Sequence, residues 1–303
     1  MRVFVTGASG HIGSALLPEL LQAGHQVVGL ARSDRSAEAL AAAGAEVRRG
    51  DLDDLDGLRE AAAAADGVIH LAFKHEEMGA GNFQAAVDAD LAAIRALASV
   101  LEGTGKPLVT SSGTLMLPLA GVTGRPGTEA DAAPGGPRVD AENFVIGLAG
   151  RGVRSAIVRL PPIVHSSLDH HGFVRILIAI ARQSGVSAYV EDGANRWPSV
   201  HTLDAARVYL LAVERAPAGT RLHAVADQGI AFREIAAAVG RGTGVPTASI
   251  SAAQAAERFP FLGPVAGVDN PASSEVTRQV LGWEPAHPGL IEDLDEGHYF
   301  KQG

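Results

Sequence analysis

The sequence predicts an α/β protein with a doubly wound parallel sheet. Two observations support this fold class. Short apolar runs of strand length alternate with helix-like segments, and a glycine-spaced turn follows the first apolar run directly. Parallel strands need crossover connections, which are right-handed, so the alternation predicts helices on both faces of one sheet. Ligands of such sheets bind at the carboxyl ends of the strands, and functional residues are expected there.

The expected elements follow one another without an internal repeat. Strands are expected where short apolar runs occur, over residues 3–5, 26–30, 46–48, 67–71, 108–111 and 155–160. Helices are expected between them, including residues 15–21, the alanine-rich 58–65 and the long 82–101. Residues 120–137 are rich in Gly, Pro and Ala and predict an irregular loop after a strand end, either mobile over the site or an inert surface loop.

The composition is that of a compact globular chain and excludes several function classes. With 303 residues, 47% hydrophobic residues and a mean hydropathy of +0.13, the chain can bury a large core. A net charge of −9 leaves no basic footprint for nucleic acid or anionic membranes, and no apolar run has the length of a membrane span. The absence of cysteine excludes disulfides and thiolate metal sites. We expect a cytoplasmic protein with a small-molecule substrate.

A phosphate-binding turn stands at the start of the chain, where residues 6–13 read TGASGHIG. Gly7 permits the tight strand-to-helix turn, Gly10 lets the backbone approach a pyrophosphate, and Gly13 allows the helix to pack closely on the strand. Free N–H groups of the first helical turn then face the phosphates. The turn therefore predicts a dinucleotide site with these contacts: Gly7, Ser9, Gly10, His11, Ile12 and Gly13.

The end of the second strand predicts which dinucleotide binds. A carboxylate there accepts a hydrogen bond from the ribose 2′-OH of NAD, whereas an arginine accommodates the 2′-phosphate of NADP. Arg32 occupies this position, Ser33 adds a hydroxyl and Arg35 adds positive charge, so NADP(H) is favoured over NAD(H). The acidic neighbour Asp34 weakens this prediction, and a solvated surface role is the alternative for Arg32.

Short motifs continue along the chain in a recognisable order. They are TGASGHIG at 6–13, GDL at 50–52, HLA at 70–72, TSSG at 110–113, RLPPIV at 159–164, VHTLDA at 200–205 and LGWEP at 281–285. The ordered set resembles the extended short-chain dehydrogenases/reductases, the NAD(P)-dependent epimerase/dehydratase family. The resemblance implies an N-terminal Rossmann domain, residues 1–160, and a smaller C-terminal α/β substrate domain, residues 161–303, from which about residues 198–215 return to the first sheet.

The resemblance also implies roles for individual residues. Asp51 and Leu52 match residues that contact adenine, although a turn or helix cap is the alternative for Asp51. Leu71 and Ala72 match residues that line the nicotinamide-side ribose, and Pro161 and Ile163 are also expected at the cofactor, because they belong to the strand exit that approaches nicotinamide in the family. The segments 82–101 and 138–148 match helices that pair in homodimers of the family, so a homodimer is expected, although packing within one subunit can use the same faces.

The chain departs from the family at the catalytic pair, which is Tyr-x-x-x-Lys with Tyr as the proton donor. Residues 116–160 contain no Tyr and no Lys, and Arg138 and Glu142 occupy the corresponding spacing. Arginine stays protonated near neutral pH, so Arg138 cannot be the same acid. Arg138 remains a candidate to polarise a carbonyl or to hold an anionic substrate, with Glu142 orienting it one helical turn on. An ordinary i,i+4 helix pair is the alternative.

Other candidate groups lie at the carboxyl ends of strands. Ser112 matches the family's catalytic Ser and Thr114 adds a hydroxyl, although such residues also simply end strands and form turns. Lys74 and His75 follow the fourth strand, where Lys74 can reach a phosphate and His75 can titrate as an acid beside the substrate. A solvated surface role is the alternative for Lys74.

His165 and Trp197 are the remaining candidates for substrate contacts. His165 ends the strand exit that approaches nicotinamide in the family, with a packed histidine as the alternative. Trp197 either caps an apolar pocket or belongs to the core. No metal is expected, because no clear helix places the nearby candidate ligands on one face; these ligands are His165, Asp169, His170 and His171.

Together these features predict an NADP(H)-dependent oxidoreductase that reduces a small carbonyl compound or oxidises the matching alcohol. An epimerase or dehydratase that retains its cofactor is the alternative within the family. Because the catalytic Tyr and Lys are missing, a dinucleotide-binding sensor without turnover is a further alternative.

Overall fold

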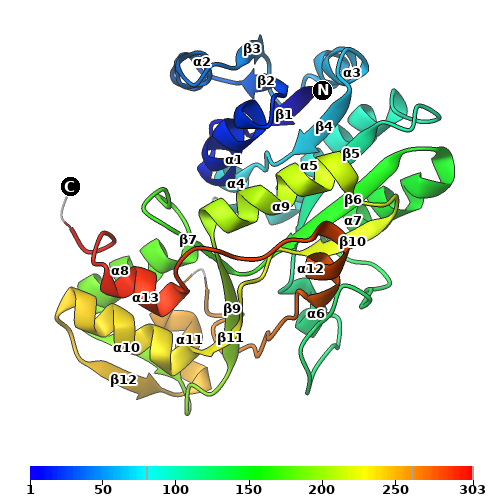
Figure 1. The fold of residues 1–303 in the computed structure, drawn as a ribbon. Coiled ribbons are helices and arrows are strands. Elements are labelled where there is room, and N and C mark those ends of the chain that lie inside the picture. Colours follow the sequence, from blue (N-terminus) through cyan, green and yellow to red (C-terminus); the bar gives the residue numbers. More distant parts are fainter. Residues whose placement is uncertain (80, 261, 302–303) are drawn as a thin grey trace.

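The computed structural model describes residues 1–79, 81–260 and 262–301, and its larger domain contains a seven-stranded parallel sheet (Figure 1). In spatial order its strands are β10 (Thr220–His223), β6 (Arg154–Leu160), β5 (Pro107–Gly113), β4 (Gly67–His70), β1 (Arg2–Thr6), β2 (Gln26–Ala31) and β3 (Glu46–Arg49). The chain first builds outward from β1 to β3 and then returns to build outward from β4. This reversal between β1 and β4 confirms the doubly wound sheet, with its switch point beside β1.

Helices cover both faces of this sheet. One face carries α1 (His11–Gln22) and α9 (Thr202–Arg215), and the other carries α3 (Leu55–Ala63), α5 (Phe83–Ser99) and α7 (Val139–Gly147). Alternate residues of β1 explain the division, because Val3 and Val5 pack with the first group whereas Phe4 packs with the second. All three side chains are almost fully buried, as expected for a central strand of a parallel sheet.

A smaller domain forms around a second hydrophobic core. One of its sheets contains β7 (Ile163–His165), β9 (Arg196–His201) and β11 (Asp227–Ala231), and a parallel pair contains β8 (Ser187–Val190) and β12 (Thr247–Ile250). The helices of this domain lie together in the lower left of Figure 1 and include α8 (Phe173–Ser184), α10 (Phe232–Thr243), α11 (Ala252–Arg258) and α13 (Leu290–Asp295). The remaining short helices of the chain are α2 (Asp34–Ala42), α4 (His75–Gly79), α6 (Met116–Leu119), the 3-10 helix at Leu148–Arg151 and α12 (Glu275–Leu281).

The chain enters the smaller domain at β7 and then returns to the large sheet. After β9, helix α9 packs on α1 and β10 adds the outermost strand beside β6, so residues 202–223 belong to the large domain (Figure 1). The chain contacts the large domain again at Trp283. This residue is buried in the large core, and its indole N–H donates to the carbonyl of Asp204 at 3.1 Å. Within the described residues, no helix is both long and apolar enough to cross a membrane.

Arg159 of β6 is a fully buried arginine that anchors its surroundings. Its guanidinium Nε donates to Glu142 of α7 at 3.1 Å, and its Nη2 donates to the carbonyl of Asp131 at 2.8 Å. The backbone of Gly127 also bridges to Ala272. These contacts hold the middle of the glycine- and proline-rich segment 120–137 against the domain. The segment is largely irregular, as expected, and contacts the domain at Gly127 and Asp131.

Glu142 is the shared counter-charge of this buried cluster. Its side chain is 3% exposed and also accepts from Arg221 at 2.8 Å. Burial by itself would raise the pKa of the Glu142 carboxyl, but the hydrogen bonds and charges of Arg159 and Arg221 together hold that pKa below its usual range. The neighbouring Ser112 hydroxyl adds a smaller lowering. The carboxylate therefore stays ionised and holds two arginines in place.

Replacing Glu142 with Gln should lower the free energy of unfolding by about 3–5 kcal/mol, because Arg159 then stays buried without its counter-charge. The carboxyl pKa is lowered in the folded state, so its contribution is present above the unfolded-state pKa of about 4.3 and is lost as the pH falls through the lower folded-state value. Urea unfolding should thus show the largest difference from the parent near neutral pH and a shrinking difference in acid.

The matched control is Glu60→Gln, which removes the partner of Arg48 in an exposed ion pair with an N–O distance of 2.8 Å. That change should cost less than about 1 kcal/mol. Equal losses in the two variants, or a Glu142→Gln loss that does not vary with pH, would contradict the buried-charge interpretation.

Candidate active site

The glycine-rich turn between β1 and α1 forms a tight cradle. Gly7 has a positive φ of 70°, and a Cβ at this position would lie 2.7 Å from the backbone nitrogen of Ala72. A Cβ on Gly13 would lie 2.2 Å from the carbonyl oxygen of Gly7, so only glycine lets the first turn of α1 pack against the loop. Gly10 is the N-cap of α1 and offers bare backbone. The cradle therefore fits a pyrophosphate at a helix N-terminus.

A cavity of about 430 Å³ opens at the carboxyl ends of β1, β2, β3 and β4. Its walls consist of Gly7, Ser9, Leu30, Arg32, Ser33, Ser36, Gly50, Asp51, Leu52, Asp53, Ala72, Phe73, Lys74, His75 and Glu76. The cavity includes the switch point of the sheet, where ligands of doubly wound proteins bind. Its volume lies within the range of small-molecule sites, and its wall offers glycine backbone, hydroxyls and charges.

Eight of the residues expected at the cofactor line this cavity, and they are Gly7, Ser9, Arg32, Ser33, Asp51, Leu52, Ala72 and Lys74. Four more, Gly10, His11, Ile12 and Gly13, form the start of α1 beside it. The His11 imidazole points to α9, since its Nε2 lies 2.7 Å from the hydroxyl oxygen of Thr202. Asp51 also forms the turn considered as its alternative, because its carboxylate accepts from the backbone N–H of Asp53 at 2.8 Å.

The side chains of Leu71, Pro161 and Ile163 are placed differently. Leu71 packs against the core of the large domain, Pro161 is buried, and Ile163 lies in the core of the smaller domain with 1% exposure. Among the described residues these three do not belong to the cavity wall.

Two ion pairs join the loop after β4 to the loops on the far side of β1. Arg32, after β2, forms a bidentate pair with Glu76 of α4, with an N–O distance of 2.6 Å for the shorter contact. Lys74 forms a pair with Asp53, after β3, at 2.6 Å. Asp34 is turned away, because it pairs with Arg49 and is not part of the wall. Sequence reasoning missed Glu76 and Asp53, since nothing in the local pattern shows which cation each one meets.

Arg138 reaches the edge of this cavity from the start of α7. It adopts a left-handed backbone conformation with φ of 63°, and its guanidinium stacks over the ring of Phe73 at 4.3 Å from the centroid. Its Nη2 donates to the carbonyl of Ser111 at 3.0 Å, and its Nη1 lies 3.8 Å from a carboxylate oxygen of Asp90. Since Phe73 lines the cavity, the guanidinium of Arg138 lies beside the cavity wall.

The expected pairing of Arg138 with Glu142 is wrong. Glu142 is buried and pairs with Arg159 and Arg221, whereas Arg138 pairs with Asp90. The spacing of four residues suggested an i,i+4 pair, but Arg138 precedes the helix in a left-handed conformation, so its side chain does not follow the helical geometry. Neither the orienting role of Glu142 nor the ordinary helix pair describes the structure.

A series of buried polar contacts begins at the Arg138 guanidinium. Asp90 of α5 is 4% exposed, and its other carboxylate oxygen lies 3.2 Å from Nε2 of His70. The Nδ1 atom of His70 lies 2.7 Å from the hydroxyl oxygen of Thr6, whose oxygen also accepts from the N–H of Ala72 at 3.3 Å. The series thus connects Arg138 to the glycine cradle. A single acidic residue on the apolar face of residues 82–101 was the sequence signal that could have pointed to Asp90.

Ser112 and Thr114 lie at the carboxyl end of β5, beside the strand whose loop lines the cavity. The Ser112 hydroxyl is buried near the Glu142 carboxylate, whose pKa it lowers, but it forms no hydrogen bond of normal geometry within the described part of the chain. An orphaned buried hydroxyl of this kind is the group expected to meet a substrate oxygen. Thr114 is fully buried and its hydroxyl oxygen accepts from the Asn270 amide at 3.1 Å, so it ties the loop to the second domain.

Two of the three tyrosines of the chain are in surroundings that do not suit the role of the missing catalytic tyrosine. Tyr209 is fully buried in α9, and its hydroxyl pairs with that of Ser111 at 2.8 Å. Burial raises the pKa of Tyr209, and burial with the charge of Asp169 raises the pKa of Tyr299. Both changes oppose the activation that a proton donor with a lowered pKa requires.

The three residues expected at the substrate have different environments. His75 lines the cavity, where desolvation and the charge of Arg138 lower its pKa and leave the imidazole neutral at pH 7. His165 is fully buried and its Nδ1 lies 2.8 Å from a carboxylate oxygen of Asp293, so it is the packed histidine of the alternative. Trp197 has no exposed surface and its indole N–H donates to Val268, so it is a core residue and not a substrate contact.

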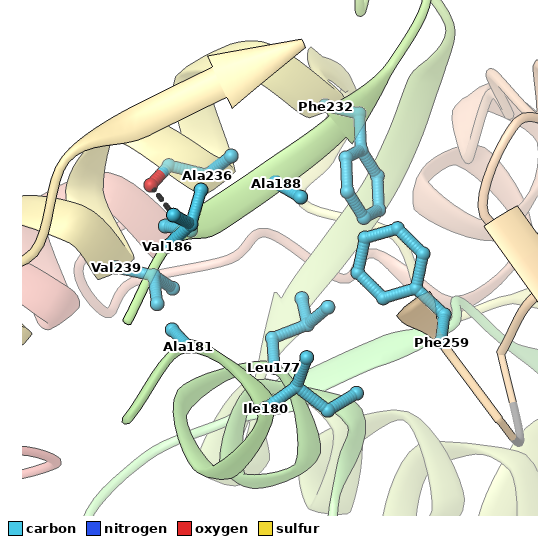
Figure 2. A pocket seen from close by; sticks show the side chains of 10 residues that line it. Leu177, Ile180, Ala181, Val186, Ala188, Phe232, Ala236, Val239 and Phe259 are labelled. Carbon is cyan, nitrogen blue, oxygen red and sulfur yellow. Dashed lines mark hydrogen bonds between the residues drawn. The ribbon is translucent and has the colours of Figure 1, made fainter. Parts of the chain in front are cut away.

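A second hollow lies inside the smaller domain and has a volume of about 10 Å³ (Figure 2). Figure 2 shows the rings of Phe232 and Phe259 beside the aliphatic side chains of Leu177 and Ile180. A space of this size holds about one water molecule. It is a packing defect of the second core, and the cavity beside the glycine cradle is the candidate site.

Two of the acidic and histidine residues near position 170 contact other groups of the protein. Asp169 accepts from the N–H of Gly172 at 2.6 Å, while His165 is held by Asp293. Within the described residues, potential ligand atoms lie within 4.8 Å of one another in a different group, which consists of Asp293, Glu296 and His298. That group lies at the end of α13 and shares no residue with the four considered from the sequence.

Comparisons with known proteins agree with this geometry. The model of the NAD dependent epimerase/dehydratase family matches residues 3–139. An uncharacterized protein of Schizosaccharomyces pombe is 46% identical over 99% of this chain and 100% of its own length. The UDP-glucose 4-epimerase of Streptomyces lividans is 28% identical, with 98% of this chain and 96% of that protein covered.

The fold also matches a solved structure of a dTDP-glucose 4,6-dehydratase, DesIV from Streptomyces venezuelae, which has NAD and TYD bound. The TM-score is 0.77 at 18% identity, with 99% of this chain and 96% of that chain covered. The chain therefore belongs to the NAD dependent epimerase/dehydratase family of extended short-chain dehydrogenases/reductases, and it is an NAD(P)-dependent enzyme.

Proposed function

We propose that this enzyme is an NADP(H)-dependent oxidoreductase that reduces a small carbonyl compound or oxidises the corresponding alcohol. The observation that carries the cofactor preference is the position of Arg32 in the cavity wall with the hydroxyls of Ser33 and Ser36. Guanidinium and hydroxyl groups suit a 2′-phosphate. The carboxylate of Asp34, which would suit a ribose 2′-OH, pairs with Arg49 outside the wall.

The chemistry at the reacting carbon would be divided among few groups. When bound, the nicotinamide supplies or accepts the hydride. The Ser112 hydroxyl would donate a hydrogen bond to the carbonyl oxygen, because it is buried without a partner at the end of β5. Arg138 would stabilise negative charge developing on that oxygen, and Thr114 would hold the loop that carries Ser112. A nearby titratable group, such as His75, or water would exchange the proton, since arginine does not.

A second candidate function is an epimerase or dehydratase that retains its cofactor, which the similarity to UDP-glucose 4-epimerase favours. The two proposals differ in net redox change. Incubation of the enzyme and NADPH with a panel of carbonyl compounds should consume NADPH, measured by its absorbance, if the oxidoreductase proposal is right. Cofactor that copurifies, does not exchange and returns to its starting redox state after turnover of a nucleotide sugar would instead support the second function.

Replacing Arg32 with Asp should weaken NADPH binding strongly, because it removes a charge-assisted contact of about 1.5–3 kcal/mol and adds repulsion. NADH should lose much less affinity. Fluorescence titration of both cofactors measures this difference. Arg215→Asp is the matched control, since it makes the same charge change at an exposed position at the end of α9, outside the cavity wall. Equal losses for NADPH and NADH would show that Arg32 does not bind the phosphate.

Substitutions at Ser112 and Arg138 test the catalytic assignment. Ser112→Ala should lower kcat by about 10- to 1000-fold with NADPH affinity largely unchanged, as for the loss of an oxyanion-type donor. Ser155→Ala is its control, because Ser155 is also a buried serine without a hydrogen-bond partner among the described residues, at the opposite end of the neighbouring strand β6. Arg138→Met should likewise reduce kcat/KM, whereas Arg278→Met, which removes a guanidinium stacked on Trp283, should not. Parent-like turnover in both Ser112→Ala and Arg138→Met would refute the assignment.

We also propose that the enzyme is a homodimer that pairs through α5 and α7. These helices pack side by side on one face of the large sheet, and apolar residues at their edge, including Leu91, Phe144 and Ile146, stay partly exposed. Isologous pairing of such faces is the commonest route to an oligomer. Light scattering at micromolar concentration should return twice the chain mass of 31.1 kDa. A mass equal to one chain would exclude the dimer at that concentration.

A further inference from the structure

The Arg32 side chain already has an anionic partner in the structure. Its Nη2 and Nη1 donate to the two carboxylate oxygens of Glu76 at 2.6 and 3.1 Å. Both residues line the candidate cofactor cavity, although they are 44 positions apart and come from the loop after β2 and from α4. A bidentate carboxylate occupies the face of a guanidinium that a phosphate would use in the same way. The Glu76 carboxylate and a phosphate would therefore compete for the same face of the Arg32 guanidinium.

A second ion pair places Glu76 in reach of Arg32. Lys74 donates to both carboxylate oxygens of Asp53, at 2.6 and 2.7 Å, and thereby holds the start of the same loop against the loop after β3. Glu76 follows two residues later at the beginning of α4. The charges of the two pairs are reversed. In the first pair the loop after β2 supplies the cation, Arg32, whereas in the second pair the loop after β3 supplies the anion, Asp53. This arrangement fixes which acidic residue of α4 meets Arg32.

The charges of the cavity wall also favour competition between Glu76 and a 2′-phosphate for Arg32. The ionised groups of the wall are the cations Arg32 and Lys74 and the carboxylates of Asp51, Asp53 and Glu76. A 2′-phosphate brings further negative charge into this excess of carboxylates. Both partners of the Arg32–Glu76 pair are well exposed, with 62% and 77% of the side-chain surface accessible, so water can screen the pair and an incoming anion can displace it.

We propose that Glu76 is a specificity-determining residue, which competes with the cofactor's 2′-phosphate for Arg32. This inference rests on the proposed NADP(H) function. Binding of NADP(H) requires Arg32 to exchange the Glu76 carboxylate for the phosphate, whereas NAD(H), which has a 2′-OH, leaves the pair intact. Glu76 thus lowers the preference for NADP(H) that Arg32 creates, and the two residues together set the ratio of the two affinities.

The direct test is Glu76→Gln, which keeps the size of the side chain and removes the competing charge. NADPH should bind about 2- to 5-fold more tightly, the range that an exposed ion pair can account for, and NADH affinity should stay the same. Fluorescence titration in low salt gives both dissociation constants. Glu77→Gln is the matched control, because it removes the same charge from the next position of α4, where Glu77 bonds to Asn82 and not to Arg32. An unchanged NADPH affinity, or an equal gain for NADPH and NADH, would overturn the proposal.

A double-mutant cycle separates this proposal from the cofactor assignment on which it rests. The gain in NADPH affinity from Glu76→Gln should vanish when Arg32 is replaced by Met, because no guanidinium is left to compete for. If Arg32→Met leaves NADPH affinity unchanged, the NADP(H) assignment itself fails. If Arg32→Met weakens NADPH binding while Glu76→Gln has no effect, the assignment stands and only the competition is refuted. Titration with 2′-phosphorylated adenosine in place of NADPH should reproduce the pattern and locate the effect at the adenosine end.

Discussion

The functional end of this enzyme depends on how closely helix α1 begins against the strand that precedes it. Gly13 has no room for a Cβ beside the carbonyl of Gly7, and Gly7 has none beside the backbone of Ala72. The second contact matters as much as the first, because it brings the loop after β4 against the cradle. Phe73, which follows Ala72, then lies where the guanidinium of Arg138 stacks on its ring. The two glycines therefore allow the loop that carries Phe73, one of the contacts of Arg138, to lie against the cradle.

Buried and exposed charges have different tasks around the site. The Arg159–Glu142 cluster and the His70–Asp90 contact are almost completely buried, and an unpaired charge there would be costly, so these groups fix the positions of α7 and of Arg138. The pairs at the cavity, Arg32–Glu76 and Lys74–Asp53, are partly solvated and contribute little to stability. Groups that are weakly held can change partner when a ligand arrives. The buried charged groups therefore hold the site in place, whereas the solvated charged groups of the cavity wall are free to change partner.

This division explains how the family's fold can persist without its usual Tyr and Lys. In the available structure the place of the pair is taken by an arginine in a left-handed conformation, supported by Asp90, and by a glutamate that belongs to a structural cluster. The hydroxyl at Ser112 stays without a partner in the described residues beside this changed corner. The cavity beside the glycine cradle contains eight of the residues expected at the cofactor, whereas the corner around Ser112 contains the guanidinium of Arg138. The cofactor assignment is accordingly carried by more residues than the catalytic one.

The sequence by itself determined the fold and the cofactor cradle. All six expected strands are present, and eight of the expected cofactor residues line one cavity, because strand periodicity, glycine spacing and the residues after each strand are local features. What the sequence did not determine is which charges meet. The spacing of Arg138 and Glu142 suggested a helical pair, yet Glu142 binds two arginines from β6 and β10, and Arg138 is supported by α5.

In the same way, only the tertiary structure showed that Glu76 reaches Arg32 and that Trp197 is buried in the second core. Such pairings depend on how distant strands are ordered in the sheet and on which side chains the two cores exclude from water. Local propensity contains no information on either, so the sequence identified the reactive residue types and the fold decided their partners.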